Sequence, residues 1–180
     1  MNVVFLDRDG TVIYDPPDER VDKIEKIKLF PDSITALKFL ADNDIGIVFI
    51  TNQAGIAESR ITEDDFWRIH NEVLMQLAPS GVKVFKTYLN GEAEGAVSEY
   101  RKPKPGMLLQ AAKELNLDLS KIYMVGDHQS DVVAGINAGC KGSILVKTAN
   151  VNVESKEAVF TARNLLEATK FIVENSQASS

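Results

Sequence analysis

The sequence predicts an α/β domain built as a three-layer, doubly wound and mainly parallel sheet with helices on both faces. Short apolar runs alternate along the chain with segments in which apolar residues recur every three to four positions. This pattern is typical of strands joined by crossover helices. Polar and charged residues follow several of the apolar runs directly. Because ligands of such sheets bind beyond the carboxyl ends of the strands, we expect these polar residues to meet in one crevice.

The first half of the chain contains three expected strands and two expected helices. Charged residues stop the first apolar run abruptly. Asp32 or Ser33 can cap the first helix, and Thr62 the second, in which apolar residues recur every three to four positions up to Leu77. The expected elements are a strand over Val3–Leu6, a helix to about Ala41, a strand over Ile45–Ile50, a helix over 63–77 and a strand over Val82–Tyr88.

The second half continues the alternation. Pro105 suits the first turn of a helix that runs to about Leu115. The following elements are a strand over Lys121–Val125, a helix over Ser130–Ala138, a short strand over Ser143–Val146 and a helix over Asn164–Val173. We expect residues 1–174 to form one domain and the polar residues 175–180 to be a disordered tail.

Composition excludes several classes of protein. With 44% hydrophobic and 26% charged residues, the 180-residue chain has the composition of a soluble globular domain, which we expect to be a monomer. A net charge of −6 gives no sign of the basic surface that nucleic-acid-binding proteins carry. No apolar run approaches the roughly 20 residues that span a bilayer, and the N-terminus lacks a signal-peptide pattern, so we expect a cytoplasmic protein. Cys140, the single cysteine, excludes an internal disulfide, and we expect His70 to be an exposed structural residue.

Two carboxylates follow the first expected strand. Asp7 and Asp9 can flank a bound phosphate, one as a nucleophile and the other as an acid and base, while Gly10 lets the backbone turn tightly. An anionic substrate repels a carboxylate nucleophile, so the site requires a cation. Mg²⁺ prefers oxygen ligands, and the candidates are Asp7, the main-chain carbonyl of Asp9, and Asp127. Taken alone, this pattern also occurs in turns and helix caps.

Phosphate-binding groups are expected at two further places. Thr51, Asn52 and Gln53 close the second expected strand and can present a hydroxyl and main-chain N–H groups to phosphate oxygens. Arg101 and Lys102 precede prolines that restrict the backbone, so that one cation can be directed inward. An ordinary turn and a solvated basic loop are the alternatives for these two segments.

A last cluster follows the strand expected over Lys121–Val125. Asp127 can reach a metal, and Asp131 can orient the loop or support the metal ligands. His128 either contacts substrate or faces solvent. Each cluster has an alternative structural explanation, but their occurrence together, each at the end or start of an expected element, favours one catalytic site.

Taken together, these motifs resemble the haloacid dehalogenase-like (HAD) phosphatase superfamily. In detail they resemble the branch that contains D,D-heptose 1,7-bisphosphate phosphatase and the histidinol-phosphatase domain. The resemblance implies a Rossmann-like sheet, Asp7 as the nucleophile and Asp9 as the group that protonates the leaving alcohol. It also implies phosphate binding by Thr51 and Lys102, and substrate contact by Arg101. The matching segments are Asp7-Arg8-Asp9-Gly10-Thr11, Thr51-Asn52-Gln53, Arg101-Lys102-Pro103, and Gly126-Asp127 with Asp131.

The chain also departs from that branch. Many members carry a zinc loop before the R-K-P motif, whereas residues 88–100 here contain neither Cys nor His, so we expect no zinc. His128 stands where the heptose enzymes usually have Lys. The short intervals between the motifs predict an open site without a separate cap domain.

Several functions fit an open site. The expected one is Mg²⁺-dependent hydrolysis of a small phosphomonoester such as D,D-heptose 1,7-bisphosphate, and the enzymatic alternatives are histidinol phosphate and a polynucleotide 3′-phosphate. A phosphoacceptor module without turnover is the non-enzymatic alternative. Asp9 argues against it, because an acceptor domain needs no acid/base carboxylate two residues after its acceptor.

Overall fold

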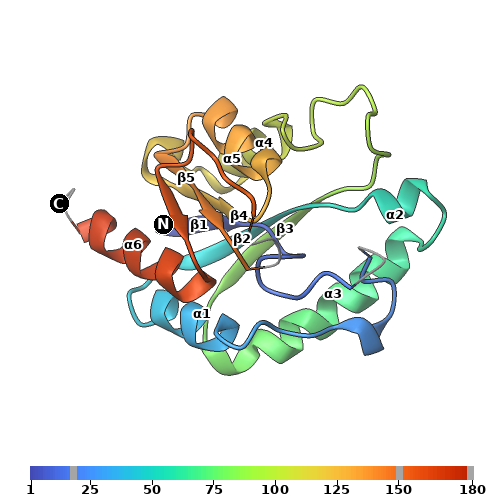
Figure 1. Cartoon of the computed structure of the whole chain (residues 1–180), viewed down its shortest axis with the longest axis horizontal. Coiled ribbons are helices and arrows are strands. Elements are labelled where there is room, and N and C mark those ends of the chain that lie inside the picture. Colours follow the sequence, from blue (N-terminus) through green and yellow to red (C-terminus); the bar gives the residue numbers. More distant parts are fainter. Residues whose placement is uncertain (17–19, 149–151, 178–180) are drawn as a thin grey trace.

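In the described part of the chain the sheet has six strands, all parallel, in the order β3-β2-β1-β4-β5-β6 (Figure 1). A computed structural model describes residues 1–16, 20–148 and 152–177 of the chain. The strands are β1 Val3–Leu6, β2 Gly46–Asn52, β3 Val84–Asn90, β4 Tyr123–Gly126, β5 Gly142–Val146 and β6 Phe160–Ala162. The helices are α1 Ser33–Ala41, α2 Ala54–Ala57, α3 Glu63–Leu77, α4 Gly106–Leu115, α5 Gln129–Ala138 and α6 Leu165–Gln177, with short 3₁₀ turns at Ile24–Lys26, Ala78–Ser80 and Leu119–Lys121.

Helices cover both faces of the sheet, which confirms the predicted three-layer α/β fold. Apolar residues of α1, α3 and α6 pack on one face, where Leu37, Ile69 and Leu165 are fully buried. On the other face α4 and α5 pack through residues such as Leu108 and Ala134. Figure 1 shows these two groups of helices on opposite sides of the strands. The central strands β1, β2, β4 and β5 are therefore buried on both sides and consist mainly of apolar residues, whereas the edge strands β3 and β6 are only partly buried.

The strand order places a crevice at the carboxyl ends of β1 and β4. The chain adds β2 and β3 on one side of β1 and then crosses to add β4, β5 and β6 on the other. Such a reversal leaves a gap between the loops that follow the two central strands, where ligands of doubly wound sheets bind. Asp7 follows β1 and Asp127 follows β4, and the Asp7 N–H donates to the Val125 carbonyl at 2.9 Å. Of the described residues, 91–105 before α4 form neither helix nor strand, so no cap domain is inserted there.

Most predicted elements are present with small shifts at their ends. Thr62 caps α3 as expected, since its hydroxyl accepts from the Asp65 N–H and the Asp65 carboxylate accepts from the Thr62 N–H. Asp32 makes no such bond to α1 and instead accepts from the N–H of Leu166 in α6. The strands β2 and β3 each extend two residues beyond the predicted end, because Thr51 and Asn52 still pair with the neighbouring strand.

The C-terminal end of the described chain differs from the prediction. Helix α6 continues to Gln177, past the expected end at Val173, so residues 175–177 are helical, while 178–180 of the expected tail lie outside the described residues. The side chains of Asn175 and Ser176 donate to the carbonyls of Phe171 and Ile172 one turn back. Both polar side chains therefore bond within the helix that contains them. None of the described helices is long and apolar enough to cross a membrane.

The expectation of an exposed His70 is wrong. The residue is 1% exposed on the buried side of α3, and its Nε2 lies 2.8 Å from the hydroxyl of Thr87 in β3. Its ring stacks on Phe66 with centroids 5.5 Å apart. Burial, assisted by the nearby Arg8, lowers the pKa of His70 to about 4, so the ring is neutral at physiological pH.

Candidate active site

Lys102 lies at the centre of a buried network at the carboxyl end of the sheet. Its ammonium nitrogen is 2.7 Å from Oδ1 of Asp7, 2.6 Å from Oδ1 of Asp131 and 2.7 Å from the carbonyl oxygen of Ile50. The contacts with Asp7 and Ile50 are hydrogen bonds, and the contact with Asp131 is an ion pair. Lys102 reaches them from the loop before α4, whereas its neighbour Lys104 is exposed. One cation therefore joins the ends of β1, β2 and the start of α5.

The charges of this network are strongly perturbed by burial. Burial raises the pKa of Asp7, as do the carboxylates of Asp131 and Asp127, while Lys102 opposes the rise. Burial alone would lower the pKa of Lys102, but Asp131 and Asp7 together raise it above its usual range. Lys102 is therefore a permanent cation beside Asp7. An acidic cluster of this kind is suited to a further cation that keeps Asp7 ionised.

Asp127 offers an unused oxygen to such a cation. The residue is fully buried, and among the described residues its Oδ2 has no hydrogen-bond partner. The other oxygen, Oδ1, accepts from the Thr11 hydroxyl at 3.4 Å. Gly10 has a φ of +77°, and a Cβ built on it would lie 2.2 Å from Oδ2 of Asp127, so only glycine lets the loop after β1 approach this closely. Hard carboxylate oxygens at a crevice fit Mg²⁺.

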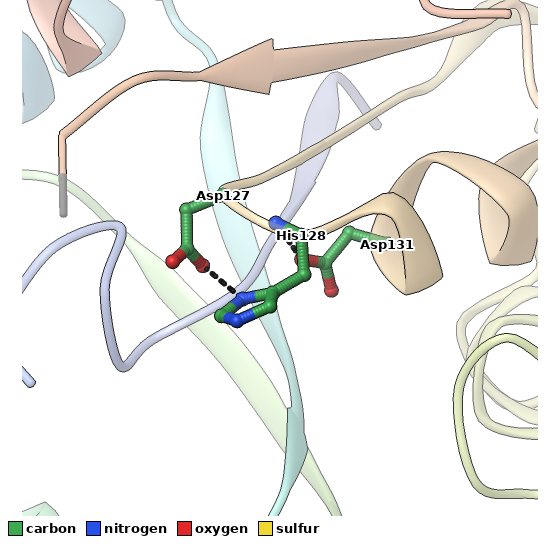
Figure 2. Close-up of side chains that lie close together, drawn as sticks. All are labelled: Asp127, His128 and Asp131. Atoms are coloured by element: carbon green, nitrogen blue, oxygen red, sulfur yellow. Dashed lines mark hydrogen bonds and ion pairs between the residues drawn. The ribbon is translucent and has the colours of Figure 1, made fainter. Parts of the chain in front are cut away.

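His128 lies beside two carboxylates of this cluster, Asp127 and Asp131 (Figure 2). Its Nδ1 is 3.0 Å from Oδ1 of Asp127, although the side chain is 59% exposed. The bond to Asp127 raises the pKa of His128 to about 9, so the imidazole carries a proton at neutral pH. Asp131 accepts from the main-chain N–H of His128 at 3.0 Å, at the start of α5. Asp131 thus fixes the loop and pairs with Lys102.

Asp9 and Gln53 are joined on the other side of the crevice. The Gln53 amide nitrogen donates to Oδ2 of Asp9 at 2.6 Å and to the hydroxyl of Thr51 at 2.9 Å. Thr51 is buried at 1% exposure and Gln53 at 8%. Arg8, which the sequence interpretation left without a role, donates to both oxygens of Asp9 at 3.0 Å. The D-R-D pattern contained this residue, but only the fold reveals that Arg8 turns back toward Asp9.

The remaining predicted substrate contacts, Asn52 and Arg101, make structural bonds. The Asn52 side chain pairs with both main-chain groups of Lys102, at 3.1 Å from the carbonyl and 3.2 Å from the N–H. Arg101 donates to the carbonyl of Glu92 at 3.0 Å. Both residues also line the cavity, so they hold the Lys102 loop while facing the space in which a ligand would lie.

A cavity of about 660 Å³ opens directly above the network. Asp7, Lys102 and Asp131 form part of its floor, and residues 94–99 of the loop after β3 form part of its wall. Arg20, from the charged segment after β1, also lines it, and no pattern in the sequence singles out this residue. Predicted site residues from four separate segments thus line one cavity, among them Asp7, Asn52, Lys102 and His128.

Comparisons with known proteins agree with this arrangement. The HAD-hydrolase-like family model matches residues 99–169. A D-glycero-β-D-manno-heptose-1,7-bisphosphate 7-phosphatase of Pasteurella multocida is 37% identical over 177 residues, which cover 94% of this chain and 95% of that protein. The histidine biosynthesis bifunctional protein of Spirosoma linguale is 34% identical, over 80% of this chain and 38% of that protein.

Solved structures give the same result. A D,D-heptose 1,7-bisphosphate phosphatase from B. bronchiseptica, crystallised with magnesium and phosphate, superposes with a TM-score of 0.88 at 27% identity, covering 97% of this chain and 99% of that one. A HAD-like phosphatase from Mesorhizobium loti gives 0.82 at 31% identity, covering 98% and 87%. Full-length relatives above 30% identity, together with the convergence of Asp7, Lys102 and Asp127, establish that the chain belongs to the HAD-like phosphatases.

Proposed function

We propose that this phosphatase hydrolyses a small sugar phosphate through an aspartyl-phosphate intermediate on Asp7. The observation that carries the proposal is the contact of Lys102 with Asp7 at the cavity, together with Asp127, whose Oδ2 has no hydrogen-bond partner in the described part of the chain. A carboxylate nucleophile needs neighbouring positive charge to approach a phosphate, and Lys102 supplies part of it.

In the first step a carboxylate oxygen of Asp7 forms a bond to phosphorus, and the bond from phosphorus to the leaving oxygen breaks. Asp9 gives a proton to that oxygen, which departs as an alcohol. Lys102 and the Thr51 segment stabilise the negative charge on the phosphoryl oxygens. Because Lys102 already donates to Asp7 and to the carbonyl of Ile50 and forms an ion pair with Asp131, a phosphoryl oxygen would be added to these partners or replace one of them.

In the second step Asp9, now a carboxylate, takes a proton from water, and the water oxygen attacks phosphorus. The bond between phosphorus and Asp7 breaks, which releases inorganic phosphate and restores both carboxyl groups.

The residues that would hold Mg²⁺ are Asp7, the main-chain carbonyl of Asp9, and Asp127. The unused, buried Oδ2 of Asp127 supports this assignment, as does the magnesium in the related B. bronchiseptica structure. Bound Mg²⁺ would supply positive charge that offsets the repulsion between Asp7 and the phosphate. The protonated His128 bonds to Asp127 through the other oxygen, Oδ1, and so leaves Oδ2 available.

A heptose 1,7-bisphosphate is the substrate we favour. Relatives that match nearly the whole chain carry that activity in their names. Arg20 and Arg101 line the cavity with Lys102, so the space that a bisphosphate would occupy is lined by cations from two different loops. The match to the histidine biosynthesis protein makes histidinol phosphate the second candidate.

A panel of phosphomonoesters tests the proposal. Purified protein with Mg²⁺ is assayed for phosphate release from both anomers of heptose 1,7-bisphosphate, histidinol phosphate, a 3′-phosphorylated oligonucleotide and p-nitrophenyl phosphate. We expect the highest kcat/KM with one heptose anomer. A higher value with histidinol phosphate or with the oligonucleotide would overturn the substrate assignment, and no release from any compound would overturn the catalytic role.

A further inference from the structure

Arg8 is a fully buried cation directly behind the proposed acid/base residue. It is 0% exposed, and in the described part of the chain its carboxylate partner is Asp9. Nε donates to Oδ2 and Nη2 to Oδ1 of Asp9, each at 3.0 Å. A bidentate pair of this kind fixes the plane of the carboxylate as well as its position. Burying a guanidinium is costly, so a solvated arginine would not adopt this position without a strong partner.

The fold holds Arg8 through both its main chain and its side chain. The Arg8 carbonyl accepts from the N–H groups of Val12 and Ile13, at 2.9 and 3.2 Å, which closes the turn after β1. At the other end, the guanidinium carbon lies 4.7 Å from the centre of the Phe66 ring in α3. His70 also stacks on Phe66, and its neutral ring adds no second positive charge. Arg8 thus connects helix α3, through its contact with Phe66, to the carboxylate of Asp9.

Gln53 holds the same carboxylate from a second direction. Its Nε2 donates to Oδ2 of Asp9 and to the hydroxyl of Thr51. Oδ2 therefore accepts two hydrogen bonds, from Arg8 and Gln53, and Oδ1 accepts one. A carboxylate oxygen has two lone pairs, so Oδ1 retains one that can carry a proton. The Asp9 side chain is 20% exposed, so it is accessible to solvent.

We propose that Arg8 and Gln53 are positioning residues that orient the Asp9 carboxylate, so that Oδ1 exchanges the proton with the leaving oxygen. This inference rests on the acid/base role of Asp9 in the proposed function. In this inference the Gln53 amide hydrogen-bonds to Asp9 and Thr51 and not to the substrate. Neither positioning residue transfers a proton itself. Replacing either residue should therefore slow the reaction most with substrates whose leaving group must be protonated.

The leaving group provides the test. A poor leaving group such as phenolate or an alkoxide depends on proton donation, whereas dinitrophenolate departs without it. A positioned general acid contributes about 10²–10⁴ in rate. In a series of substituted phenyl phosphates, Gln53→Ala and Arg8→Lys should therefore lose at least about tenfold more kcat/KM with phenyl phosphate than with 2,4-dinitrophenyl phosphate. Arg8→Lys retains the charge but loses the bidentate geometry.

Matched controls separate this effect from general damage. Gln110→Ala and Arg163→Lys change the same residue types on the surface of α4 and before α6, where they bond to Glu114 and Glu167. Both should behave as wild type. A variant that is partly unfolded or binds Mg²⁺ poorly loses activity equally across the series. If Arg8→Lys does not fold, Gln53→Ala alone decides the outcome.

Asp9→Asn completes the comparison. If it steepens the dependence on the leaving group and the two positioning variants do so as well, the inference is supported. If Asp9→Asn steepens it but Arg8→Lys and Gln53→Ala lower all rates evenly or leave them unchanged, the inference is wrong and the role of Asp9 survives. If Asp9→Asn leaves the dependence unchanged, the acid/base role in the proposed function is wrong, and the inference fails with it.

Discussion

The ammonium nitrogen of Lys102 lies 2.7 Å from Oδ1 of Asp7, although the two residues are 95 positions apart in the sequence. The contact depends on the loop before α4, which Asn52 at the end of β2 holds through both main-chain groups of Lys102. A buried cation beside a buried carboxylate leaves both groups desolvated, which strengthens their interaction with a bound phosphate. The contact therefore connects the fold to the proposed chemistry.

Loss of Lys102 should impair the chemical step. Removing one such charged donor typically costs about 10²–10³ in rate, and we expect Lys102→Ala to lower kcat by this factor. Lys104→Ala should have a much smaller effect, because that side chain is exposed and two residues further along the loop. Steady-state kinetics of both variants with one aryl phosphate measure the difference. Equal or reversed losses would mean that Lys102 is not the lysine that acts on the phosphate.

Replacement of the nucleophile should abolish turnover without loss of the fold. Asp7→Asn keeps the shape of the side chain and removes the attacking oxyanion. Because burial raises the pKa of Asp7, the neutral amide also relieves the cost of a buried charge, and Lys102 keeps Asp131 as its partner. We expect a Tm equal to or above that of the wild type. Wild-type turnover by this variant would contradict the covalent mechanism.

Activity should depend on Mg²⁺ and not on zinc. Chelation with EDTA should abolish activity, and added Mg²⁺ should restore it, since Asp7 and Asp127 provide hard oxygen ligands. A ligand that binds only the folded state raises Tm, so Mg²⁺ should stabilise the wild type but not Asp127→Asn, a readout independent of turnover. Metal analysis that found one tightly bound zinc per chain would contradict the expectation for the loop after β3.

Acid should destabilise the fold through His70. Its pKa falls from the usual 6.5 to about 4 in the folded chain, because of burial and Arg8, with a smaller opposing effect of Asp9. Between these values the unfolded chain binds the proton and the folded chain does not, so stability falls as the pH falls from 6.5 to 4. The loss attributable to His70 should approach roughly 3 kcal/mol at pH 4.

His70→Gln removes this titration and keeps a side chain that can hydrogen-bond to Thr87. The difference in unfolding free energy between the variant and the wild type, measured with denaturant at several pH values, isolates the contribution of His70. The wild type should lose more stability than the variant over this range. If the unfolding free energies of the wild type and the variant changed with pH in parallel, His70 would not have the lowered pKa that its burial implies.

The sequence was sufficient for the elements that carry a strong local pattern. Helix α3 was predicted with its N-cap because apolar spacing and Thr62 agree, and the catalytic carboxylates were placed because they follow apolar strands directly. Strand β6 was missed, since three residues at a sheet edge carry too little periodicity. The burial of His70 was missed as well, because it depends on Thr87, which lies in a different element.

Interactions between neighbours can be as hard to predict as long-range ones. Arg8 and Asp9 are adjacent in the sequence, yet their side chains meet only because the turn after β1 folds Arg8 against Phe66 in α3. Gln53 was expected to bind phosphate, and its amide bonds to Asp9 and Thr51. Motif spacing identifies which residues gather at the site, but the direction of each side chain is set by tertiary packing.

Trapping of the covalent intermediate tests the central claim most directly. The enzyme is mixed with an aryl phosphate and Mg²⁺, quenched in acid within one turnover and reduced with borohydride, which converts an aspartyl phosphate to homoserine. Peptide mass spectrometry should locate homoserine at position 7 only in samples that received substrate. Burst release of the phenol without any modification of Asp7, or modification of another residue, would contradict the assignment of Asp7 as the nucleophile.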